Sequence, residues 1–330
     1  MKYYLALDGG GSKTVCLIFD ESLRILGYGS SGPANYQSIG LESAIKNINE
    51  AIENAKKSLD FQYPISSACF SLAGINSRID YKRMLKRIAE GHYASKIRVV
   101  HDGEASLNAA TLGKKGIIVI LGTGSLVAGY DDKGNYYRCC DWGHLLGDEG
   151  SAYRISIRIL SLILKGFDGR IAMPIIGYEI AKLLKIENFD EIVTYVYTDW
   201  QVKDIAKFAS FIIGKAEKDR QIYKILEEEA NEIAEGVKVI SEKVKSKEVY
   251  LTGGLVNSSK NRIYTNIVKE SIRSKIPDCK IRILRSSSLL GSALIALKED
   301  NVTINKKLLM NLKREFRKFQ KEIDRLAIQS

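Results

Sequence analysis

Two glycine-rich turns, each placed between apolar segments, suggest the first chemistry in this sequence. One is Asp8-Gly-Gly-Gly-Ser-Lys-Thr14, and the other is Leu121-Gly-Thr-Gly-Ser125. Because glycine lacks a Cβ, backbone N–H groups in such turns can come close to phosphate oxygens. Two turns of this kind on one chain predict that they hold one polyphosphate together, and ATP is the polyphosphate we expect.

Polar residues add to both turns. The expected phosphate contacts are Gly10, Gly11, Ser12, Lys13, Thr14, Gly122, Thr123 and Gly124. Asp8 would end the first strand, where its carboxylate could hold hydrated Mg²⁺. Neither turn is a standard fingerprint: Ser12 replaces the glycine that precedes the lysine of a P-loop. Val127 stands where a dinucleotide motif has its third glycine, and a strand follows instead of a helix.

A third turn, Leu251-Thr-Gly-Gly254, lies between a predicted strand and a helix that we expect to start near Asn257. Gly253 and Gly254 could pass beneath the sugar or base of a nucleotide. Any one of the three turns could be an ordinary structural turn. Three of them at corresponding strand ends favour a nucleotide site.

Composition restricts the class of protein. The chain has 330 residues, 45% of them apolar and 27% charged, which fits two globular domains. It contains no apolar run long enough to span a membrane, and its first residues enter a strand at once rather than forming a signal peptide. The five cysteines form no CxxC pair, which suggests reduced thiols and a cytoplasmic protein.

The net charge of +11 could indicate a nucleic-acid partner. However, the lysines and arginines are spread over many predicted helices, and the densest cluster, 306–325, also contains acidic residues. No nucleic-acid motif accompanies them. We therefore expect solvated helix faces and no nucleic-acid partner.

Strands and helices alternate along the chain, and the pattern occurs twice. The first set has predicted strands at Tyr3–Leu7, Val15–Phe19, Ile25–Tyr28, Ser67–Leu72 and Ile97–Val100, with helices at Leu41–Leu59 and Tyr81–Ala89. The second has strands at Gly116–Leu121, Leu126–Tyr130, Tyr136–Cys139, Val249–Leu251 and Ile281–Leu284, with helices across 151–245. We expect duplicated α/β domains: residues 1–113 plus about 286–330, and residues 114–285.

Four segments carry a resemblance to a known family. They are Trp142-Gly-His-Leu-Leu-Gly-Asp-Glu-Gly-Ser-Ala-Tyr153, Ser31-Gly-Pro-Ala-Asn35, His101-Asp-Gly-Glu-Ala105 and Gly291-Ser-Ala-Leu-Ile-Ala296. The chain resembles the acetate kinase, sugar kinase, heat-shock-70 and actin superfamily from residue 1 to about Leu297. Within it, the chain is similar to the branch of N-acetylglucosamine kinase, archaeal broad-specificity hexokinase and the BadF/BadG/BcrA/BcrD-type ATPases.

The resemblance implies two ribonuclease H-like (actin-like ATPase) domains with a cleft for nucleotide and sugar. It also implies phosphorylation of the C6 hydroxyl of N-acetylglucosamine, glucose, glucosamine or mannose. Asp102 would be the general base, a task that a carboxylate can perform. With Asp8, it would also contact Mg²⁺ through water. From local pattern alone, Asp102 could instead be the N-cap of a helix starting near Glu104.

The resemblance also implies a set of sugar contacts. They are Asn35, Asp102, Ser125, Trp142, Gly143, Asp148 and Glu149. Alternatives remain for three of these residues. Asn35 could stabilise a turn, Glu149 could sit in the first turn of a helix beginning near Ser151, and Trp142 could pack in the core.

Two other functions remain open. One is an ATPase that activates a redox enzyme, whose relatives hold an iron–sulfur cluster with cysteines. The other is a sugar sensor without catalysis. The expected partners are a sugar, ATP and a second copy of the chain, because heptad spacing predicts a helix over 305–328 that could pack on the first domain or form a dimer seam. The repeat residues are Leu309, Leu312, Phe316, Phe319, Ile323 and Leu326.

Overall fold

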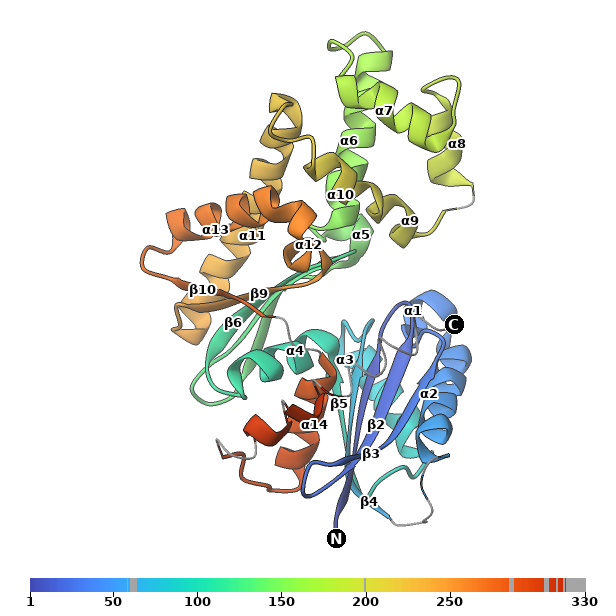
Figure 1. Cartoon of the computed structure of the whole chain (residues 1–330), viewed down its shortest axis with the longest axis vertical. Coiled ribbons are helices and arrows are strands. Elements are labelled where there is room, and N and C mark those ends of the chain that lie inside the picture. The colour runs from blue at the N-terminus through green and yellow to red at the C-terminus, as the bar shows by residue number, and fades with distance from the viewer. Residues whose placement is uncertain are drawn as a thin grey trace. The chain divides into compact units, whose positions relative to one another are not determined.

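The computed structural model describes residues 1–57, 59, 64–198, 200–284, 288–305, 309–312, 314–316 and 318. The chain divides into two compact units (Figure 1). Unit 1 comprises Met1–Lys114 and Ser286–Ser330, and unit 2 comprises Lys115–Arg285. Each unit is built on its own five-stranded sheet.

The sheet of unit 1 has the order β3-β2-β1-β4-β5. Its strands are β1 (Tyr3–Gly9), β2 (Thr14–Asp20), β3 (Ile25–Ser31), β4 (Ile65–Leu72) and β5 (Lys96–His101). The first three strands are antiparallel neighbours, whereas β4 and β5 run parallel to β1. The carboxyl ends of β1, β4 and β5 therefore meet at one edge of the sheet.

The sheet of unit 2 repeats this pattern in the order β10-β9-β6-β7-β8. Its strands are β6 (Gly116–Leu121), β7 (Ser125–Tyr130), β8 (Tyr136–Cys140), β9 (Glu248–Thr252) and β10 (Lys280–Ile283). Again the first three strands are antiparallel, and the last two run parallel to the first. The duplicated α/β architecture expected from the sequence is therefore present.

Helices cover both faces of the sheet of unit 1, because apolar side chains alternate along its strands. Leu5 and Leu7 belong to the core beneath α2 (Leu41–Lys56) and α3 (Arg78–Ala89), near the short α1 (Tyr36–Ile39). Tyr4 and Ala6 belong to the core beneath α14 (Ser288–Glu299). On that side α14 also packs on α4 (Asp102–Thr111), so closely that a Cβ on Gly291 would lie 1.7 Å from the carbonyl oxygen of Ala105.

The described part of the C-terminal heptad segment packs on unit 1. Leu312 is 1% exposed, and Leu309 and Phe316 contact the same core as Tyr4 and α14. Phe319, Ile323 and Leu326 lie outside the described residues. Packing on the first unit thus accounts for the described half of the repeat.

Unit 2 contains a largely helical stretch between its strands β8 and β9. The helices are α5 (Gly143–Leu146), α6 (Ala152–Phe167), α7 (Ile175–Leu184), α8 (Glu191–Tyr197), α9 (Val202–Ala206), α10 (Phe208–Ile213) and α11 (Arg220–Val244). After β9 come α12 (Gly254–Asn257), a 3₁₀ turn (Ser259–Asn261) and α13 (Arg262–Lys275). Helix formation therefore starts three residues before the Asn257 expected from the sequence.

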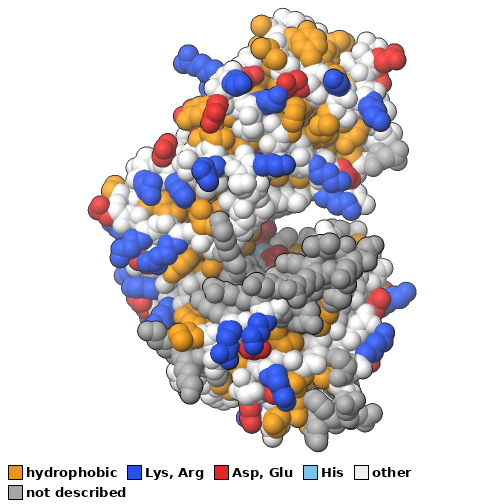
Figure 2. Space-filling view, in the orientation of Figure 1, with side chains coloured by type: hydrophobic (Ala, Val, Ile, Leu, Met, Phe, Trp, Pro, Cys, Tyr) orange, Lys and Arg blue, Asp and Glu red, His pale blue; other side chains and the backbone are white. Residues whose placement is uncertain are grey.

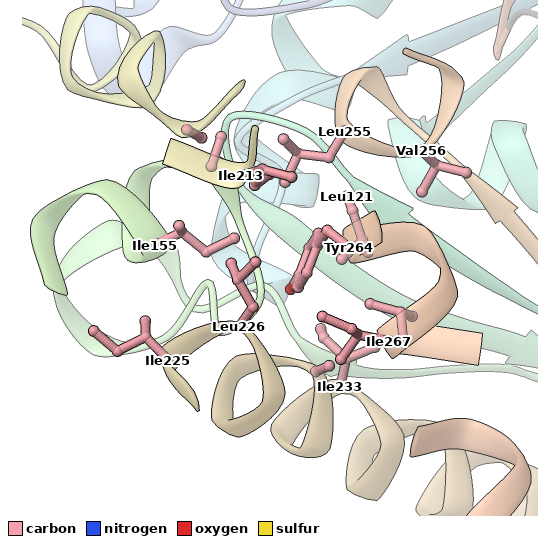
Figure 3. Close-up of a cluster of buried hydrophobic side chains, with 14 of the residues drawn as sticks. Leu121, Ile155, Ile213, Ile225, Leu226, Ile233, Leu255, Val256, Tyr264 and Ile267 are labelled. Atoms are coloured by element: carbon pink, nitrogen blue, oxygen red, sulfur yellow. The ribbon is translucent and has the colours of Figure 1, made fainter. Parts of the chain in front are cut away.

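The core of unit 2 surrounds Tyr264, which comes from α13 (Figure 3). Figure 3 shows its ring among apolar side chains from β6, α6, α10, α11 and α12. Tyr264 is 1% exposed, and its ring packs with Leu226 and Ile233 of α11 in this cluster. Burial of this ring anchors α13 to the helical stretch.

Basic side chains are scattered among acidic and apolar ones over the face drawn in Figure 2, as far as its residues are described. This distribution agrees with solvated helix faces. In the described parts of the chain, no helix has the length and apolar character needed to cross a membrane.

Candidate active site

The first glycine-rich turn is a four-residue connection between β1 and β2, whose last pair is Gly9 with Thr14. The N–H of Gly10 donates to the carbonyl of Lys13 at 3.0 Å, which closes the turn. The carbonyl of Gly10 accepts from the N–H groups of Ala34 and Asn35 at 3.0 and 3.3 Å. Gly11 through Lys13 are exposed, and a Cβ on Gly11 would meet nothing within 4 Å. Within unit 1 the turn thus presents an open outer side.

Thr14 differs from the other members of this turn. It is fully buried at the start of β2, and its hydroxyl donates to the carbonyl of Gly32 at 2.7 Å. A hydroxyl in this position ties the turn to the segment after β3 instead of facing a ligand. The Thr14 hydroxyl is therefore engaged by the backbone, and its expected phosphate contact stays a prediction.

Asp8 lies near the end of β1, opposite Ser71 of β4. The hydroxyl of Ser288, the first residue of α14, donates to its carboxylate. Burial, with a further contribution from the negative charge of Asp102, raises the pKa of Asp8 to about 6 against the opposing effect of the Ser288 hydrogen bond. Two carboxylates thus share the same edge of the sheet.

Asp102 is the first residue of α4, directly after β5. The N-cap is His101, whose Nδ1 lies 3.0 Å from the N–H of Gly103, so the cap role considered for Asp102 belongs to its neighbour. The Oδ1 of Asp102 accepts from the same N–H at 2.8 Å and lies 3.0 Å from Nδ1. The protonation state of Nδ1 therefore decides whether it accepts from the amide or donates to the carboxylate.

The side chain of Asp102 is 38% exposed. Burial tends to raise its pKa, but the charge and hydrogen bond of His101, together with backbone N–H donors, hold the pKa below its ordinary value. Asp102 is therefore an ionised, accessible carboxylate at the helix N-terminus.

Asn35 is the N-cap of α1, and its Oδ1 accepts from the N–H of Gln37 at 3.1 Å. It lies against Gly74, which has a φ of +81° and where a Cβ would stand 2.3 Å from Oδ1. The turn-stabilising role considered for Asn35 is therefore present. The same contacts fix the direction of its amide, which can both donate to and accept from hydroxyls.

The second glycine-rich turn connects β6 and β7 in unit 2. The N–H of Gly122 donates to the carbonyl of Gly124 at 2.9 Å. The first amides of α6 hold the turn: Ala152 donates to the carbonyl of Gly122 at 2.9 Å, and Tyr153 donates to that of Thr123 at 3.2 Å. Thr123 is exposed.

The third turn passes directly over the end of β6. Gly253 has a φ of +102°, and a Cβ there would lie 2.2 Å from the carbonyl oxygen of Leu121. Gly254, which begins α12, is exposed and faces open space. The second and third turns are thus brought together, as their placement at neighbouring strand ends predicts.

Asp148 lies in a segment with unusual backbone conformations. Positive φ angles occur at Cys140, Asp141, Gly143, Asp148 and Gly150, and such clusters often mark functional sites. Asp148 is 7% exposed, and its Oδ1 accepts from the N–H of Ser125 at 3.4 Å. Burial raises its pKa to about 6, with the charges of Asp141 and Glu149 adding to the rise and the Ser125 amide opposing it.

Gly150 is held on both sides by residues that the sequence reasoning did not identify. Its N–H donates to Glu229 of α11 at 2.7 Å, and its carbonyl accepts from the hydroxyl of Tyr264 at 2.9 Å. Glu229 is 2% exposed and pairs with Arg158 at 2.9 Å. One signal was present: Glu229 interrupts the apolar stripe of α11. We call Glu229, Tyr264 and Gly150 the Gly150 clamp.

The remaining expected sugar contacts lie on this segment. Trp142 is 56% exposed, with the Arg138 guanidinium 5.0 Å from its ring centre, so the alternative that Trp142 packs in the core is wrong. Gly143 begins α5 with a φ of +79°, and Glu149 is partly exposed. Ser125 is buried.

The carboxylates at the sheet edge of unit 1 are of the type that binds Mg²⁺ in proteins. Mg²⁺ keeps several waters and is usually bound by one or two carboxylates plus substrate phosphates. Asp8 and Asp102 offer such a pair. Among the residues that the structure describes, no three His, Cys, Asp or Glu side chains converge on a metal site. These residues therefore do not form a metal site in which protein side chains alone supply three or more ligands.

The chain matches the model of the BadF/BadG/BcrA/BcrD ATPase family over residues 5–296. It belongs to this family. The match confirms the resemblance drawn from the sequence, and it spans both units of this BadF/BadG-type chain. A family of ATPases also supports ATP as the nucleotide.

Curated relatives cover nearly the whole chain. An N-acetylmuramic acid/N-acetylglucosamine kinase of Clostridium acetobutylicum is 32% identical over 91% of this chain and 99% of its own length. An N-acetyl-D-glucosamine kinase of Dictyostelium discoideum is 26% identical over 89% and 97%. A structure from Chromobacterium violaceum, provisionally assigned as an N-acetylglucosamine kinase, superposes with a TM-score of 0.72 at 18% identity, covering 90% and 99% of the two chains. That superposition supports the two-domain actin-like fold.

Proposed function

We propose that this BadF/BadG-type protein is an ATP-dependent sugar kinase that phosphorylates the C6 hydroxyl of a hexose or N-acetylhexosamine. The candidate acceptors are N-acetylglucosamine, glucose, glucosamine and mannose. The kinase names of the curated relatives support the reaction class. The observation that carries the proposal is Asp102, an accessible carboxylate that directly follows β5 and shares its sheet edge with Asp8.

Asp102 acts as the general base in this proposal. As the C6 oxygen attacks the γ-phosphate, its proton passes to the carboxylate of Asp102, and ADP leaves. Asn35 and Asp148 orient the sugar through hydroxyl hydrogen bonds, with Ser125, Trp142, Gly143 and Glu149 as further contacts. The α4 N-terminus and the clamp keep these groups in place before the substrate binds.

The glycine turns receive the nucleotide. Backbone N–H groups of Gly10–Lys13 and Gly122–Gly124 bind phosphate oxygens, and the turn at Gly253 and Gly254 lies next to the nucleoside. Asp8 and Asp102 would hold Mg²⁺ through water, and the ion would supply positive charge to the phosphates. Negative charge develops on the phosphoryl group in the transition state. N–H donors and cations that are already in position stabilise this charge effectively.

The test measures ADP release from Mg·ATP with hexoses, amino sugars and N-acetylated sugars. We expect release with at least one sugar, and loss of release in Asp102→Asn. Glu104→Gln is the matched control because Glu104 lies in the same first turn of α4, where it approaches Arg98 at 3.8 Å. ADP release that no sugar stimulates would replace the proposal with an activating ATPase. No release with any sugar would favour a sensor.

A further inference from the structure

Two adjacent cysteines at the end of β8 point toward the same place. Neighbouring side chains of a strand normally face opposite sides of the sheet. Cys140 departs from this rule because its φ is +63°. A Cβ placed on Gly236 of α11 would lie 3.1 Å from the Sγ of Cys140 and 3.5 Å from that of Cys139. The missing side chain of Gly236 thus leaves room for both sulfurs.

The two sulfurs share a proton. A hydrogen bond from the Cys140 thiol lowers the pKa of Cys139 to about 6, and Lys243 adds to this shift against the effect of burial. The pKa of Cys140 rises correspondingly. Near neutral pH the pair therefore contains one thiolate, which is the reactive form of cysteine. Cys139 is partly exposed, whereas Cys140 is 8% exposed.

The other three cysteines lack this combination. Cys16 and Cys69 are fully buried, and burial raises their pKa. Cys279 is partly exposed, but burial also raises its pKa, and it has no cysteine next to it in the sequence. It is therefore a suitable single-thiol control.

We propose that Cys139 and Cys140 form a two-sulfur binding site for a soft, thiophilic centre, of which trivalent arsenic is the representative. Thiolates are the protein ligands that soft centres prefer. A monosubstituted arsenic oxide reacts with the thiol and the thiolate to form two As–S bonds, and its oxygen leaves as water with the proton that the sulfurs share and one proton from solvent. No oxidant or reductant is needed. Because the second thiol adjoins the first, the second bond forms within one molecule and is favoured by its high effective concentration.

Occupation of this site would act on the segment that follows it. Asp141 has a φ of +60° directly after Cys140, and the chain continues through Trp142 to Asp148. Moving Cys140 toward a shared arsenic atom would shift the start of this segment. We expect sugar turnover to fall at least about fivefold, because misplacing substrate contacts by ~1 Å can cost up to about 100-fold in rate. This consequence rests on the proposed function, whereas binding itself does not.

The probe is phenylarsine oxide, added to the full-length reduced protein after removal of free thiols. We expect one equivalent to bind with loss of two titratable thiols under native conditions. The adduct should resist 2-mercaptoethanol and be reversed by 2,3-dimercaptopropanol, since only a dithiol can replace both bonds. Retention after the monothiol wash should fall at least about tenfold in Cys139→Ser and in Cys140→Ser, because each loses the intramolecular second bond, and remain unchanged in Cys279→Ser.

Release of the wild-type label by the monothiol as easily as from Cys139→Ser would overturn the proposal, as would loss of retention in Cys279→Ser. Thermal unfolding identifies any variant that fails to fold. Cys139→Ser carries the test if Cys140→Ser is unfolded, because Cys139 is the more exposed residue. Tight binding in a protein that turns over no sugar would support the site and refute the proposed function.

Discussion

Units 1 and 2 share one strand order but place their charges differently. Asp8 of β1 pairs with Val15 and Ser71, and the equivalent position in β6 is Ile120, which pairs with Leu126 and Thr252. The same frame therefore carries a carboxylate in one copy and an apolar side chain in the other. In unit 1 the acidic groups stand at strand ends, where parallel strands bring them together.

Unit 2 gains its carboxylates in another way. After β3, unit 1 returns at once to its glycine turn, because the amides of Ala34 and Asn35 bond to Gly10. After β8, unit 2 first forms the segment with positive φ angles and only then bonds Ala152 to Gly122. The shared frame thus positions the two glycine-rich turns, whereas the carboxylates are added separately to each unit.

The largest effect should come from the unit 1 acid, Asp102. Asp102→Asn removes a general base, whose contribution is typically about 10²- to 10⁴-fold, so we expect kcat to fall by about 10³-fold with little change in the KM of the sugar. Steady-state kinetics with Glu104→Gln as control measure this split. A turnover close to that of the wild type would remove Asp102 from the chemistry.

The unit 2 acid, Asp148, should act on binding and on stability. Asp148→Asn should raise the KM of the sugar by about 100-fold, the size of a lost charge-assisted hydrogen bond of ~2.7 kcal/mol. In the wild type, the KM should also rise as pH falls through about 6, where Asp148 becomes protonated. A KM that is independent of pH between 5 and 7 would argue against this role.

Although Asp148→Asn should weaken sugar binding, it should make the folded protein more stable at neutral pH. Because burial raises the pKa of Asp148 in the folded state, its favourable contribution is present below about pH 4 and is lost as pH rises through about 6. At pH 7.5 the variant should therefore be more stable than the wild type by about 2 kcal/mol, a gain that shrinks toward pH 5. Urea unfolding at both pH values measures the difference.

Each unit has a glycine with a positive φ angle just after a parallel strand, Gly74 in unit 1 and Gly253 in unit 2. Gly74 lies two residues after the end of β4, and Gly253 directly follows β9. A Cβ on Gly253 would meet backbone, which cannot move away, and we expect Gly253→Ala to cost about 3 kcal/mol or more. A Cβ on Gly74 would meet side-chain atoms of Asn35 and Gln37 and no backbone atom among its three nearest contacts. Gly74→Ala should therefore cost about 1–2 kcal/mol and weaken sugar binding. Gly254→Ala, which faces open space, is the neutral control; equal costs for all three would contradict this reasoning.

The smallest effect should come from the Gly150 clamp. Tyr264→Phe removes the donor to Gly150 and should cost about 1–2 kcal/mol of stability. If the clamp positions Asp148, the KM of the sugar should also rise about fivefold, the effect of roughly 1 kcal/mol on binding, while the KM of ATP stays the same. Glu229→Gln keeps an acceptor for the Gly150 amide and should retain most of the sugar affinity. Equal increases in both KM values would reduce the clamp to a purely structural role.

The strand frame could be predicted because its signals are local. Short apolar runs bounded by glycine or acidic turns gave β6 its observed limits, Gly116–Leu121, and predicted β5 as Ile97–Val100, one residue short at each end. Helix ends were predicted less accurately. Helix α2 ends at Lys56 instead of the expected Leu59, and no glycine, asparagine or proline among the three residues after Lys56 marks this end in the sequence. Site roles deduced from the resemblance stay predictions until kinetics test them.

What the sequence did not reveal depends on contacts between distant residues. Glu229 and Tyr264 are far from Gly150 in the sequence, and no residue next to Gly150 in the sequence predicts these hydrogen bonds. The burial of Thr14 was missed for the same reason, since its partner Gly32 lies in the segment after β3. The shared direction of Cys139 and Cys140 depends on one left-handed residue and on a glycine in α11.

The late position of α14 in the chain has a consequence for biosynthesis. The face of the unit 1 sheet that carries Tyr4, Ala6 and Phe19 is covered by α14 and Leu312, which are translated only after all of unit 2. The opposite face receives α2 and α3 from nearby sequence. While the ribosome makes unit 2, only α4 is available to cover part of this face, so the nascent chain displays an incompletely covered apolar sheet, a state prone to aggregation. Chaperone demand during translation should end only when α14 emerges from the exit tunnel.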